Sequence, residues 1–483
     1  MTSGGEIGLD IDGLRQQLAG APDGSRLRPL GLGRLVAGAG ALDALAGLVA
    51  GLRRPGGDVV VLAAATPMSV GGRDLRSVVE EALGAGSAVN WVVLGPGFVH
   101  ADEPTVAAAA AAAAGAGCVI TVGSGTITDI GKAAAPGAAP LVAVQTATSV
   151  NGYADPFSVL LRRGVKRTTA SRWPDALVID PAVLQDAPPD LNRAGAGDLM
   201  AMFTATADWY LASAVAGKGD AAGDPPYHPA VAGIALARGQ RLLALAPRLS
   251  ARPDPAALAE LADMLTLSGI AMGVAGSTAP SSGMEHAISH LLEMAATTRG
   301  QQPGFHGTQV GVASIVAART WALVLRIIAD GGLDRAARLP DPDAVRDRIG
   351  RAFAAIDPGG AMAAECFDDY ARKLRRLGSG GDPGAPLAAL RSSWAAHRAV
   401  LEDVLIGPAP LAGALRSAGL PVRFRDLAEP VDDATACWAV ASSPLLRQRF
   451  GVADLAMLLG AWEDADVEEV LAGPSSASAA GPP

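Results

Sequence analysis

The spacing of apolar and polar positions changes part-way along this chain. Up to about residue 145, short β-branched runs alternate with stretches whose apolar residues recur at helical spacing. The predicted strands are Val59–Ala65, Val89–Leu94, Cys118–Val122 and Leu141–Val144, and the helices between them are Asp74–Leu83 and Glu103–Ala114. Strands joined by helices of this length predict βαβ units and a parallel sheet.

The alternation stops after residue 155. Asp155–Leu161 and Val165–Ala170 flank Arg162-Arg163-Gly164, which predicts a hairpin, and Ala176–Asp180 returns to the sheet. Every later periodic segment has helical spacing: Leu191–Ala214, Ala230–Leu249, Ala256–Gly273, Met284–Ala296, Val310–Ile328, Arg346–Leu377, Pro386–Leu405 and Pro410–Ala418.

The predicted fold is therefore α/β, with an N-terminal Rossmann-like parallel-sheet domain and a C-terminal all-helical domain. We place the first domain at residues 30–182 and the second at residues 183–470. Residues 471–483 are predicted to form a disordered tail of small residues. Residues 1–29 are predicted to be a loose arm, and 216–229 and 333–345 to be loops, because they are polar and contain glycine or proline.

One strand end carries a glycine turn. The strand Cys118–Val122 stops at Gly123-Ser124-Gly125, and a helical pattern starts at Thr126 that carries Asp129 and Lys132 one turn apart. A strand, a glycine turn and a helix start let backbone amides approach a phosphate closely. Such turns also join strands to helices for packing reasons, so the turn alone leaves both interpretations open.

Three segments of the helical part hold candidate metal ligands: Gly195-Ala196-Gly197-Asp198, Ser282-Gly283-Met284-Glu285-His286-Ala287-Ile288-Ser289-His290 and Phe305-His306-Gly307. Asp198 taken alone suits a helix cap as well as a ligand. His286 and His290 are four residues apart and so share one side of a helix.

The chain has only six histidines, and three of them lie between residues 286 and 306. Capped or core histidines could cluster in this way. One carboxylate and two imidazoles also form a site for Zn²⁺, Fe²⁺ or Ni²⁺ with open positions for a substrate oxygen. Such a metal polarises a carbonyl or holds an alkoxide, as hydride transfer requires.

Together these motifs resemble the family that contains sn-glycerol-1-phosphate dehydrogenase, glycerol dehydrogenase, iron-containing alcohol dehydrogenases and 3-dehydroquinate synthase, over residues 35–330. The glycine turn with Asp129 and Lys132 resembles the family's GGGSxxDxxK loop, and Thr146-Ala147-Thr148-Ser149-Val150-Asn151-Gly152 resembles its PTxxSxDG stretch. Gly164-Val165-Lys166-Arg167 with Pro174–Asp180 resembles its second hairpin and the strand that follows. The form Ser-Gly-Met-Glu-His at residues 282–286 is most similar to the glycerol-1-phosphate dehydrogenase branch.

The resemblance implies a dehydroquinate synthase-like fold and a set of roles. It makes Asp198, His286 and His306 the ligands of one divalent metal, with zinc favoured and nickel or iron as alternatives. His290 would be a neighbouring group or proton relay, and Lys166 and Asn151 would face the substrate. NAD or NADP would contact Gly123, Ser124, Gly125, Thr126, Asp129, Thr146, Ser149 and Thr66.

Several positions depart from the family pattern. Gln145 stands where proline is usual, Asn151 replaces an aspartate that contacts substrate hydroxyls, and Thr308 replaces the glutamate of HGE. The stretch ending at Thr66 lacks the acid that would hold the ribose 2′-hydroxyl of NAD, which leaves the choice between NAD and NADP open. Arg73 could neutralise a 2′-phosphate or be a solvated helix residue.

The sequence thus predicts a metal-dependent, NAD(P)-linked oxidoreductase of a small polyol or polyol phosphate, with interconversion of dihydroxyacetone phosphate and glycerol 1-phosphate as the best single assignment. A sugar-phosphate cyclase resembling 3-dehydroquinate synthase and a catalytically silent relative are the alternatives. A mononuclear iron oxygenase would share the ligand types, but its usual β-rich scaffold has no counterpart in the pattern.

Charge, cysteine content and apolar stretches exclude several other classes of protein. The net charge is -9 and no basic cluster is visible, so nucleic acid is disfavoured as a partner. Cys118, Cys366 and Cys437 are too dispersed for a disulfide scaffold or a cysteine-rich zinc site. The apolar stretch Val106–Ala114 is too short to span a bilayer, and no signal peptide is evident. We therefore expect a cytoplasmic homo-oligomer that acts on a small molecule without membrane insertion.

Overall fold

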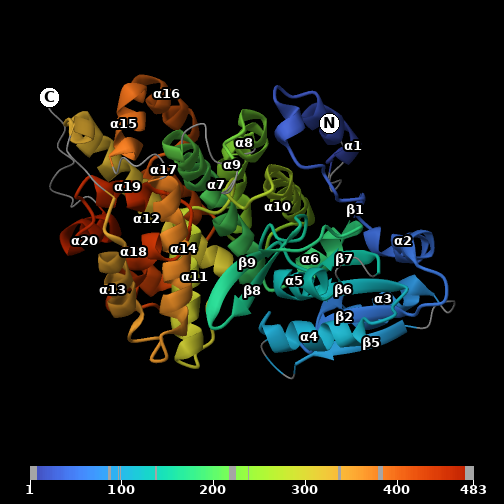
Figure 1. Cartoon of the computed structure of the whole chain (residues 1–483). Coiled ribbons are helices and arrows are strands. Elements are labelled where there is room, and N and C mark those ends of the chain that lie inside the picture. Colours follow the sequence, from blue (N-terminus) through green and yellow to red (C-terminus); the bar gives the residue numbers. More distant parts are fainter. Residues whose placement is uncertain are drawn as a thin grey trace.

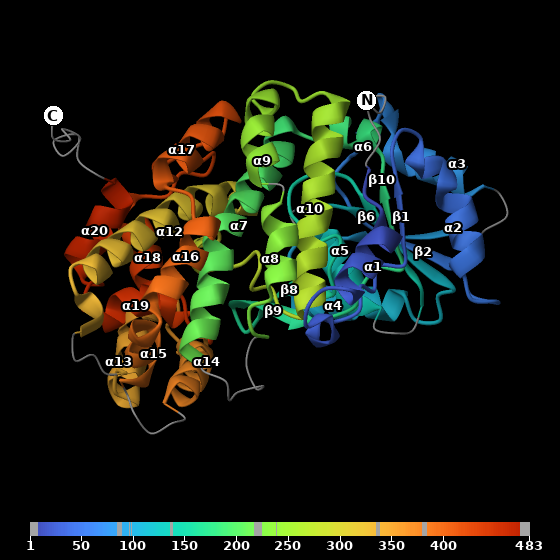
Figure 2. The ribbon, with the colours of Figure 1, turned by 90° about the horizontal axis from the view of Figure 1, so that it is seen from above.

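A parallel sheet and a bundle of helices lie side by side in the computed structural model of the chain (Figure 1). The structure describes residues 8–84, 89–95, 97, 99–135, 139–216, 225–237, 239–334, 339–378 and 384–473. The sheet is drawn in blue to cyan and the helical part in green to red, and in both views the two parts lie next to each other (Figure 2).

Within the described residues the sheet has six strands in the order β1-β10-β7-β6-β2-β5, and all neighbours are parallel. Their bounds are β1 (Arg34–Ala37), β2 (Val59–Ala64), β5 (Val89–Leu94), β6 (Cys118–Gly123), β7 (Leu141–Gln145) and β10 (Ala176–Ile179). The chain passes from β2 out to β5 and then returns to β6 on the other side of β2. The strand order therefore switches direction between β2 and β6, and crevices that bind ligands form at the carboxyl ends of strands at such a point.

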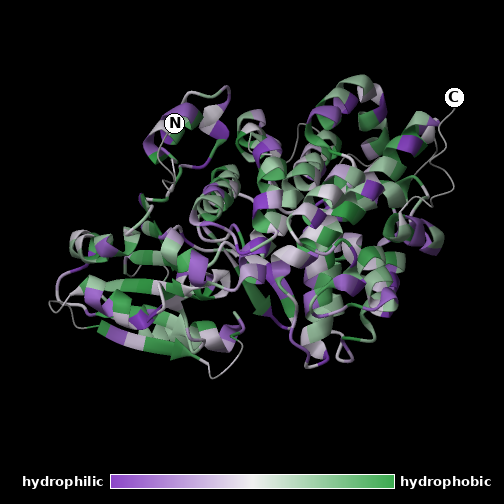
Figure 3. Ribbon diagram, turned by 180° about the vertical axis from the view of Figure 1, so that it is seen from behind, coloured by the Kyte–Doolittle hydropathy of each residue, from purple (hydrophilic) through white to green (hydrophobic). Residues whose placement is uncertain are grey.

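Helices cover both faces of this sheet. In β2, Val59 and Val61 pack on one face with α2 (Leu45–Leu52) and α3 (Leu75–Leu83), and Val60 and Leu62 pack on the other with α4 (Glu103–Ala112) and α5 (Gly125–Ala134). Strands buried on both faces have continuous apolar runs, which explains why these strands were detectable in the sequence. The strands are correspondingly green in the hydropathy view (Figure 3).

A predicted hairpin lies between the sheet and the helices (Figure 1). β8 (Phe157–Arg162) and β9 (Val165–Ala170) pair in antiparallel register. The two connecting residues, Arg163 and Gly164, both have positive φ, 49° and 79°. This is the backbone form that two-residue hairpin turns require. A smaller hairpin, β3 (Ser69–Val70) with β4 (Arg73–Asp74), was not predicted and sits between β2 and α3.

The remainder of the described chain is helical, as predicted for the residues after Pro181. The bounds are α6 (Pro181–Asp186), α7 (Pro189–Ala216), α8 (Pro229–Leu236), α9 (Gly239–Leu245), α10 (Pro255–Ala275), α11 (Met284–Thr298), α12 (His306–Ala329), α13 (Pro342–Phe353), α14 (Ala361–Leu377), α15 (Ala385–Ser392), α16 (Trp394–Val404), α17 (Pro408–Ser417), α18 (Asp433–Ser442), α19 (Val452–Leu458) and α20 (Asp464–Ala472).

The N-terminal region departs from the prediction of a loose arm. Residues Ile11–Ala19 form α1, whose start is capped by the Asp10 side chain. Ile11, Leu14 and Leu18 are buried in an apolar cluster shared with α10. Their spacing is that of a helix with one buried face. The sequence analysis gave this spacing less weight than the glycine and proline residues around it. Residues 1–7 lie outside the described part.

Two predicted long helices are interrupted. The stretch 346–377 divides into α13 and α14 at Asp357-Pro358-Gly359-Gly360, where Gly360 has φ 71°, a conformation that ends helical geometry. The stretch 386–405 divides into α15 and α16 at Ser393. The predicted loop 333–345 contains the start of α13, and residues 335–338 within it lie outside the described part, as do residues 217–224 of the loop 216–229. α20 extends to Ala472, and the rest of the predicted tail beyond Gly473 is also outside it.

Two of these helices are long and apolar enough to cross a bilayer by composition alone. They are α10 and α12, with 94% and 67% of their most apolar windows buried inside the protein. Burial of this kind is what core helices show, and both pack against other helices of the bundle. They are core elements of this fold.

Candidate active site

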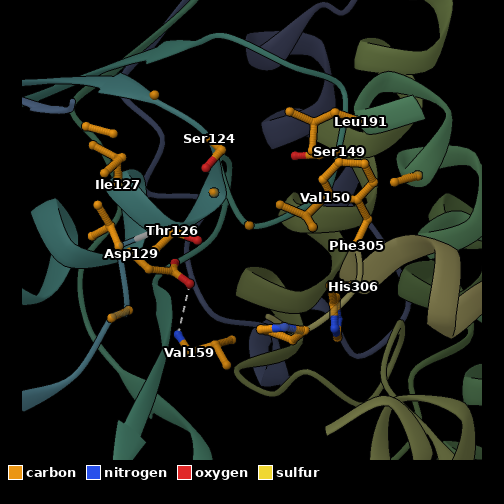
Figure 4. A pocket seen from close by; sticks show the side chains of 18 of the residues that line it. Ser124, Thr126, Ile127, Asp129, Ser149, Val150, Val159, Leu191, Phe305 and His306 are labelled. Atoms are coloured by element: carbon orange, nitrogen blue, oxygen red, sulfur yellow. Dashed lines mark hydrogen bonds between the residues drawn. The ribbon is translucent and has the colours of Figure 1, made fainter. Parts of the chain in front are cut away.

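One large cavity lies between the carboxyl edge of the sheet and the helices. Its volume is about 900 Å³, within the range of sites that enclose a small molecule and much of a cofactor. Residues after β2, β6 and β7 line one end, and residues from α7, α11 and α12 line the other. Figure 4 shows Ser124 and Thr126 on one side of this space and Phe305 and His306 on the other.

The glycine turn stands at the switch point of the sheet. A Cβ on Gly123 would lie 2.6 Å from Ile127, and one on Gly125 would lie 2.5 Å from Val150, so both positions need glycine for close packing. Ser124 is the N-cap residue of α5 and makes no side-chain capping bond. The first amides of α5 therefore face the cavity without a side-chain cap, and a helix start of this kind favours an anion.

Asp129, predicted to contact the cofactor, lines the same cavity but already has two partners. Its Oδ2 accepts a hydrogen bond from the Val159 amide at 3.0 Å (Figure 4), and its Oδ1 lies 3.0 Å from Lys132 Nζ. Burial raises the pKa of Asp129 despite Lys132. Lys132 is fully buried and also bonds to Asp155 and the Gly152 carbonyl. The pair therefore fastens the β8–β9 hairpin to α5.

The other predicted cofactor residues, Thr66, Thr146 and Ser149, also line the cavity. The lining also includes Asp74 and Asp186, which the sequence analysis did not single out. Arg73, considered there as a partner for a 2′-phosphate, instead pairs with Glu81 at 2.6 Å.

Asp198, His286 and His306 come together at the helical end of the cavity. One ligand atom from each lies within 4.8 Å of the others. Asp198 Oδ1 is 3.3 Å from His286 Nε2 and 3.9 Å from His306 Nε2. Asp198 Oδ1 is buried and has no hydrogen-bond partner among the described residues, although Oδ2 accepts a bond from the Asn151 amide at 3.2 Å. A buried carboxylate oxygen without a partner is costly, and a cation would remove that cost.

Close contact between two helices produces this convergence. A Cβ on Gly197 in α7 would lie 2.3 Å from the Gly307 carbonyl of α12, and one on Gly307 would lie 2.1 Å from the Ala194 carbonyl. The backbones therefore touch next to Asp198 and His306. Asp198 lies inside α7, so the alternative that it caps a helix start is wrong.

Two glutamates orient the ligand histidines through their Nδ1 atoms. His286 Nδ1 lies 3.1 Å from Glu285 Oε1, and His306 Nδ1 lies 2.7 Å from Glu293 Oε1. A carboxylate on Nδ1 keeps the proton there and leaves Nε2 as a lone-pair donor, as metal-binding histidines require. Burial opposes charge on His286, but Asp198 and Glu285 raise its pKa above the ordinary value. One carboxylate oxygen and two imidazole nitrogens within 4.8 Å of one another are a donor set that fits a divalent cation.

The three residues to which the sequence analysis gave catalytic roles, His290, Lys166 and Asn151, all line the cavity. Lys166 forms an ion pair with Glu293. Burial alone would raise the pKa of Glu293, but Lys166 and His306 hold it at about 2. The side-chain amide of Asn151 donates to Ser268 Oγ at 3.1 Å. Arg167 instead pairs with Glu365 and Asp369 and is not among the lining residues.

Comparison with known proteins agrees with this arrangement. Residues 36–188 match the family model described as iron-containing alcohol dehydrogenase. Glycerol-1-phosphate dehydrogenase [NAD(P)+] of Bacillus licheniformis is 32% identical over 292 residues, which cover 58% of this chain and 71% of that protein. The chain belongs to the iron-containing alcohol dehydrogenase family. Within it, the similarity is to the glycerol-1-phosphate dehydrogenase branch, since the protein of that name from Methanothrix thermoacetophila is 30% identical over 59% of this chain and 75% of the relative.

A solved structure extends the agreement on the fold. The crystal structure of a probable glycerol dehydrogenase from Sinorhizobium meliloti 1021 aligns with a TM-score of 0.55 at 18% identity, covering 91% of this chain and 94% of that one. The alignment covers more than residues 35–330, so helices after residue 330 are also part of the shared fold. The predicted fold class is thereby confirmed.

Sequence reasoning missed the groups that support the ligands. Glu285 and Glu293 were not singled out, although Glu285 precedes His286 and Glu293 lies one turn beyond His290 on α11. Acidic residues adjacent to candidate histidine ligands are the signal that could have identified them. The contributions of Asp74 and Asp186 to the cavity depend on the β3–β4 hairpin, which the pattern did not reveal.

Proposed function

We propose that this protein is an NAD(P)-dependent, metal-dependent dehydrogenase that interconverts dihydroxyacetone phosphate and sn-glycerol 1-phosphate. The observation that carries the proposal is that the open cluster of Asp198, His286 and His306 shares one cavity with the uncapped start of α5. Its relatives named glycerol-1-phosphate dehydrogenase [NAD(P)+] support the same substrate.

One end of the cavity would bind the cofactor, and the other would bind the metal and the substrate carbonyl. The amides of Gly125 and Thr126 would bind the dinucleotide diphosphate at the start of α5. A divalent cation held by Asp198, His286 and His306 would polarise the substrate carbonyl, while the reduced nicotinamide supplies hydride. The amide of Asn151 orients Asp198 so that Oδ1 points to the histidines.

The substrate phosphate is assigned to Lys166. Lys166 lines the cavity next to His290 and His306, and its pairing with Glu293 holds the ammonium in place. Arg167, the next residue along β9, is instead paired with Glu365 and Asp369. Cytoplasmic location and homo-oligomerisation stay predictions, testable by fractionation and by light scattering of the purified protein.

Carbonyl turnover tests the proposal directly. Purified protein supplied with Zn²⁺, Ni²⁺ or Fe²⁺ should oxidise NADH or NADPH with dihydroxyacetone phosphate and show far less activity with dihydroxyacetone or simple aldehydes. The signal is the loss of absorbance of the reduced nicotinamide. Absence of turnover with every carbonyl, despite bound metal, would favour a cyclase or a silent relative.

NADH should be the preferred cofactor, by roughly tenfold or more in kcat/KM, which corresponds to about 1.4 kcal/mol. The adenosine ribose of a dinucleotide binds beyond the carboxyl end of a strand such as β2. Asp74 and Asp186 both line the cavity, and Asp74 supplies the negative charge there because Asp186 is paired with Arg252. A 2′-phosphate adds about -1.5 to -2 charge and would be repelled there. Steady-state kinetics with both cofactors measure the ratio.

Asp74→Asn should lower the ratio of kcat/KM with NADH to kcat/KM with NADPH, because it removes a negative charge from the cavity lining. Asparagine still caps α3 as aspartate does, so the fold should not change. The matched control is Asp341→Asn, a capping residue on α13 remote from the cavity lining. It should leave the ratio unchanged. A wild-type preference for NADPH would contradict the assignment.

A further inference from the structure

A segment near the C-terminal end of the described chain reaches the active site. Arg447 lies between η6 (Ser443–Leu445) and α19, and its guanidinium bridges two residues of the Ser282–His290 motif. Its Nη1 donates to Ser282 Oγ at 2.7 Å, and its Nη2 lies 3.2 Å from His290 Nδ1. Ser282 and His290 both line the cavity.

This contact fixes the direction of a hydrogen bond. A guanidinium carries only donors and stays protonated, so Nδ1 of His290 must accept. The neutral ring then carries its proton on Nε2. His286 and His306 have the opposite polarity, because carboxylates face their Nδ1 atoms. The two ligand histidines thus present lone pairs, whereas His290 presents an N–H.

The surroundings of His290 agree with an uncharged ring. Its side chain is buried, with a residue exposure of 4%. The Arg447 guanidinium lies 3.2 Å from its Nδ1, so a charged ring would bring a second positive group against that guanidinium. Burial and the cationic neighbour both disfavour an imidazolium, and the neutral ring still carries one hydrogen to donate.

We infer that His290 serves as a neutral hydrogen-bond donor to the reacting oxygen of the substrate, and that Arg447 is the positioning residue that sets this polarity. The inference rests on the proposed function and replaces the proton-relay role predicted from the sequence. Because Arg447 occupies Nδ1 with a donor, no proton can enter the ring there while another leaves Nε2. A neutral imidazole can still stabilise charge that develops on an oxygen, and the proton that converts the alkoxide to the alcohol then comes from water.

The segment that carries Arg447 is anchored on both sides. The Leu446 carbonyl accepts a bond from Arg167 Nη1 at 3.0 Å, and the Val452 amide donates to Asp208 Oδ1 at 3.1 Å. Asp208 Oδ2 in turn accepts from the Met284 amide at the start of α11. The guanidinium is thus fixed relative to the helix that carries His290.

Two substitutions at His290 distinguish a hydrogen-bond donor from a proton relay. The side-chain amide of His290→Gln can occupy the place of Nε2 and donate, but it cannot shuttle a proton. We expect His290→Gln to keep kcat within roughly tenfold of the wild type, whereas His290→Ala should lose about 10²-fold, the usual effect of removing one preorganised donor. Equal losses in both variants would overturn the inference.

A double-mutant cycle tests the role of Arg447. Arg447→Met should lower kcat roughly 10-fold to 100-fold with little change in KM, and should have no further effect in the His290→Ala background. The matched control is Arg449→Met, because Arg449 bonds to the same turn through the Ser282 carbonyl and Ser277 Oγ. Any loss it causes should persist in the His290→Ala background. An Arg447→Met effect that is equally large in both backgrounds would overturn the positioning role.

Nitrogen NMR of the histidine rings gives a readout that does not depend on turnover. The signal that disappears in His290→Gln should show an unprotonated Nδ1 and a protonated Nε2 at pH 7, and Arg447→Met should mix the tautomers. A protonated Nδ1 in the wild type would refute the inference. If the wild-type protein turns over no carbonyl but shows the expected tautomer, the proposed function fails and the assigned polarity of His290 stands.

Discussion

His306→Ala is expected to remove both the bound metal and the activity. His306 supplies one of three ligand atoms that lie within 4.8 Å of one another, and two remaining ligands hold a divalent ion weakly. Loss of Lewis-acid assistance removes several kcal/mol of transition-state stabilisation, so kcat/KM should fall by about 10³-fold or more. Metal analysis after dialysis and the dihydroxyacetone phosphate assay measure the two effects.

The fold should survive this change, because His306 begins α12 and is not part of the apolar core. Its thermal midpoint in the metal-free state should stay close to that of the metal-free wild type. His397→Ala is the matched control, since His397 on α16 contacts Tyr210 on α7 and does not line the cavity. Metal retention together with full activity in His306→Ala would refute the ligand assignment.

The sequence predicted the sheet well because its strands are buried on both faces. β2, β6 and β7 are continuous apolar runs, and that pattern needs no tertiary information. β1 was missed because it has only four residues and gains its stability by pairing with β10. The interruption after α13 did have a local signal, Asp357-Pro358-Gly359-Gly360, and the sequence analysis gave it too little weight against the helical spacing on either side. The break between α15 and α16 at Ser393 has no glycine or proline to mark it.

The site was predictable as far as its residues occur in short motifs. The glycine turn and the histidine pair on α11 are local patterns, and the structure brings both into one cavity. Tertiary contacts decide the rest. Arg447 is far from His290 in sequence, and the partners of Asp129 on β8 follow from the position of the hairpin. Spacing along the chain carries no signal for such contacts.

Gly197→Ala is expected to damage stability and metal binding together. The added Cβ would lie 2.3 Å from the Gly307 carbonyl and 3.5 Å from Gly311 Cα, so α7 and α12 must move apart. Overpacking of this kind costs about 1–3 kcal/mol and sometimes more. Since Asp198 and His306 lie beside the contact, their separation should grow and metal affinity should fall. Calorimetry of the metal-free protein and a metal titration measure both.

The same substitution at another helical glycine should raise the free energy of unfolding instead of lowering it. Gly233 in α8 is exposed and has nothing within 4 Å of an added Cβ. Gly233→Ala should therefore gain up to about 1 kcal/mol from helix propensity and leave metal binding unchanged. Comparing the two variants separates the effect of the contact between α7 and α12 from the general effect of replacing glycine with alanine in a helix. If Gly197→Ala were as stable as Gly233→Ala and bound metal normally, close contact between α7 and α12 could not be what brings Asp198 to His306.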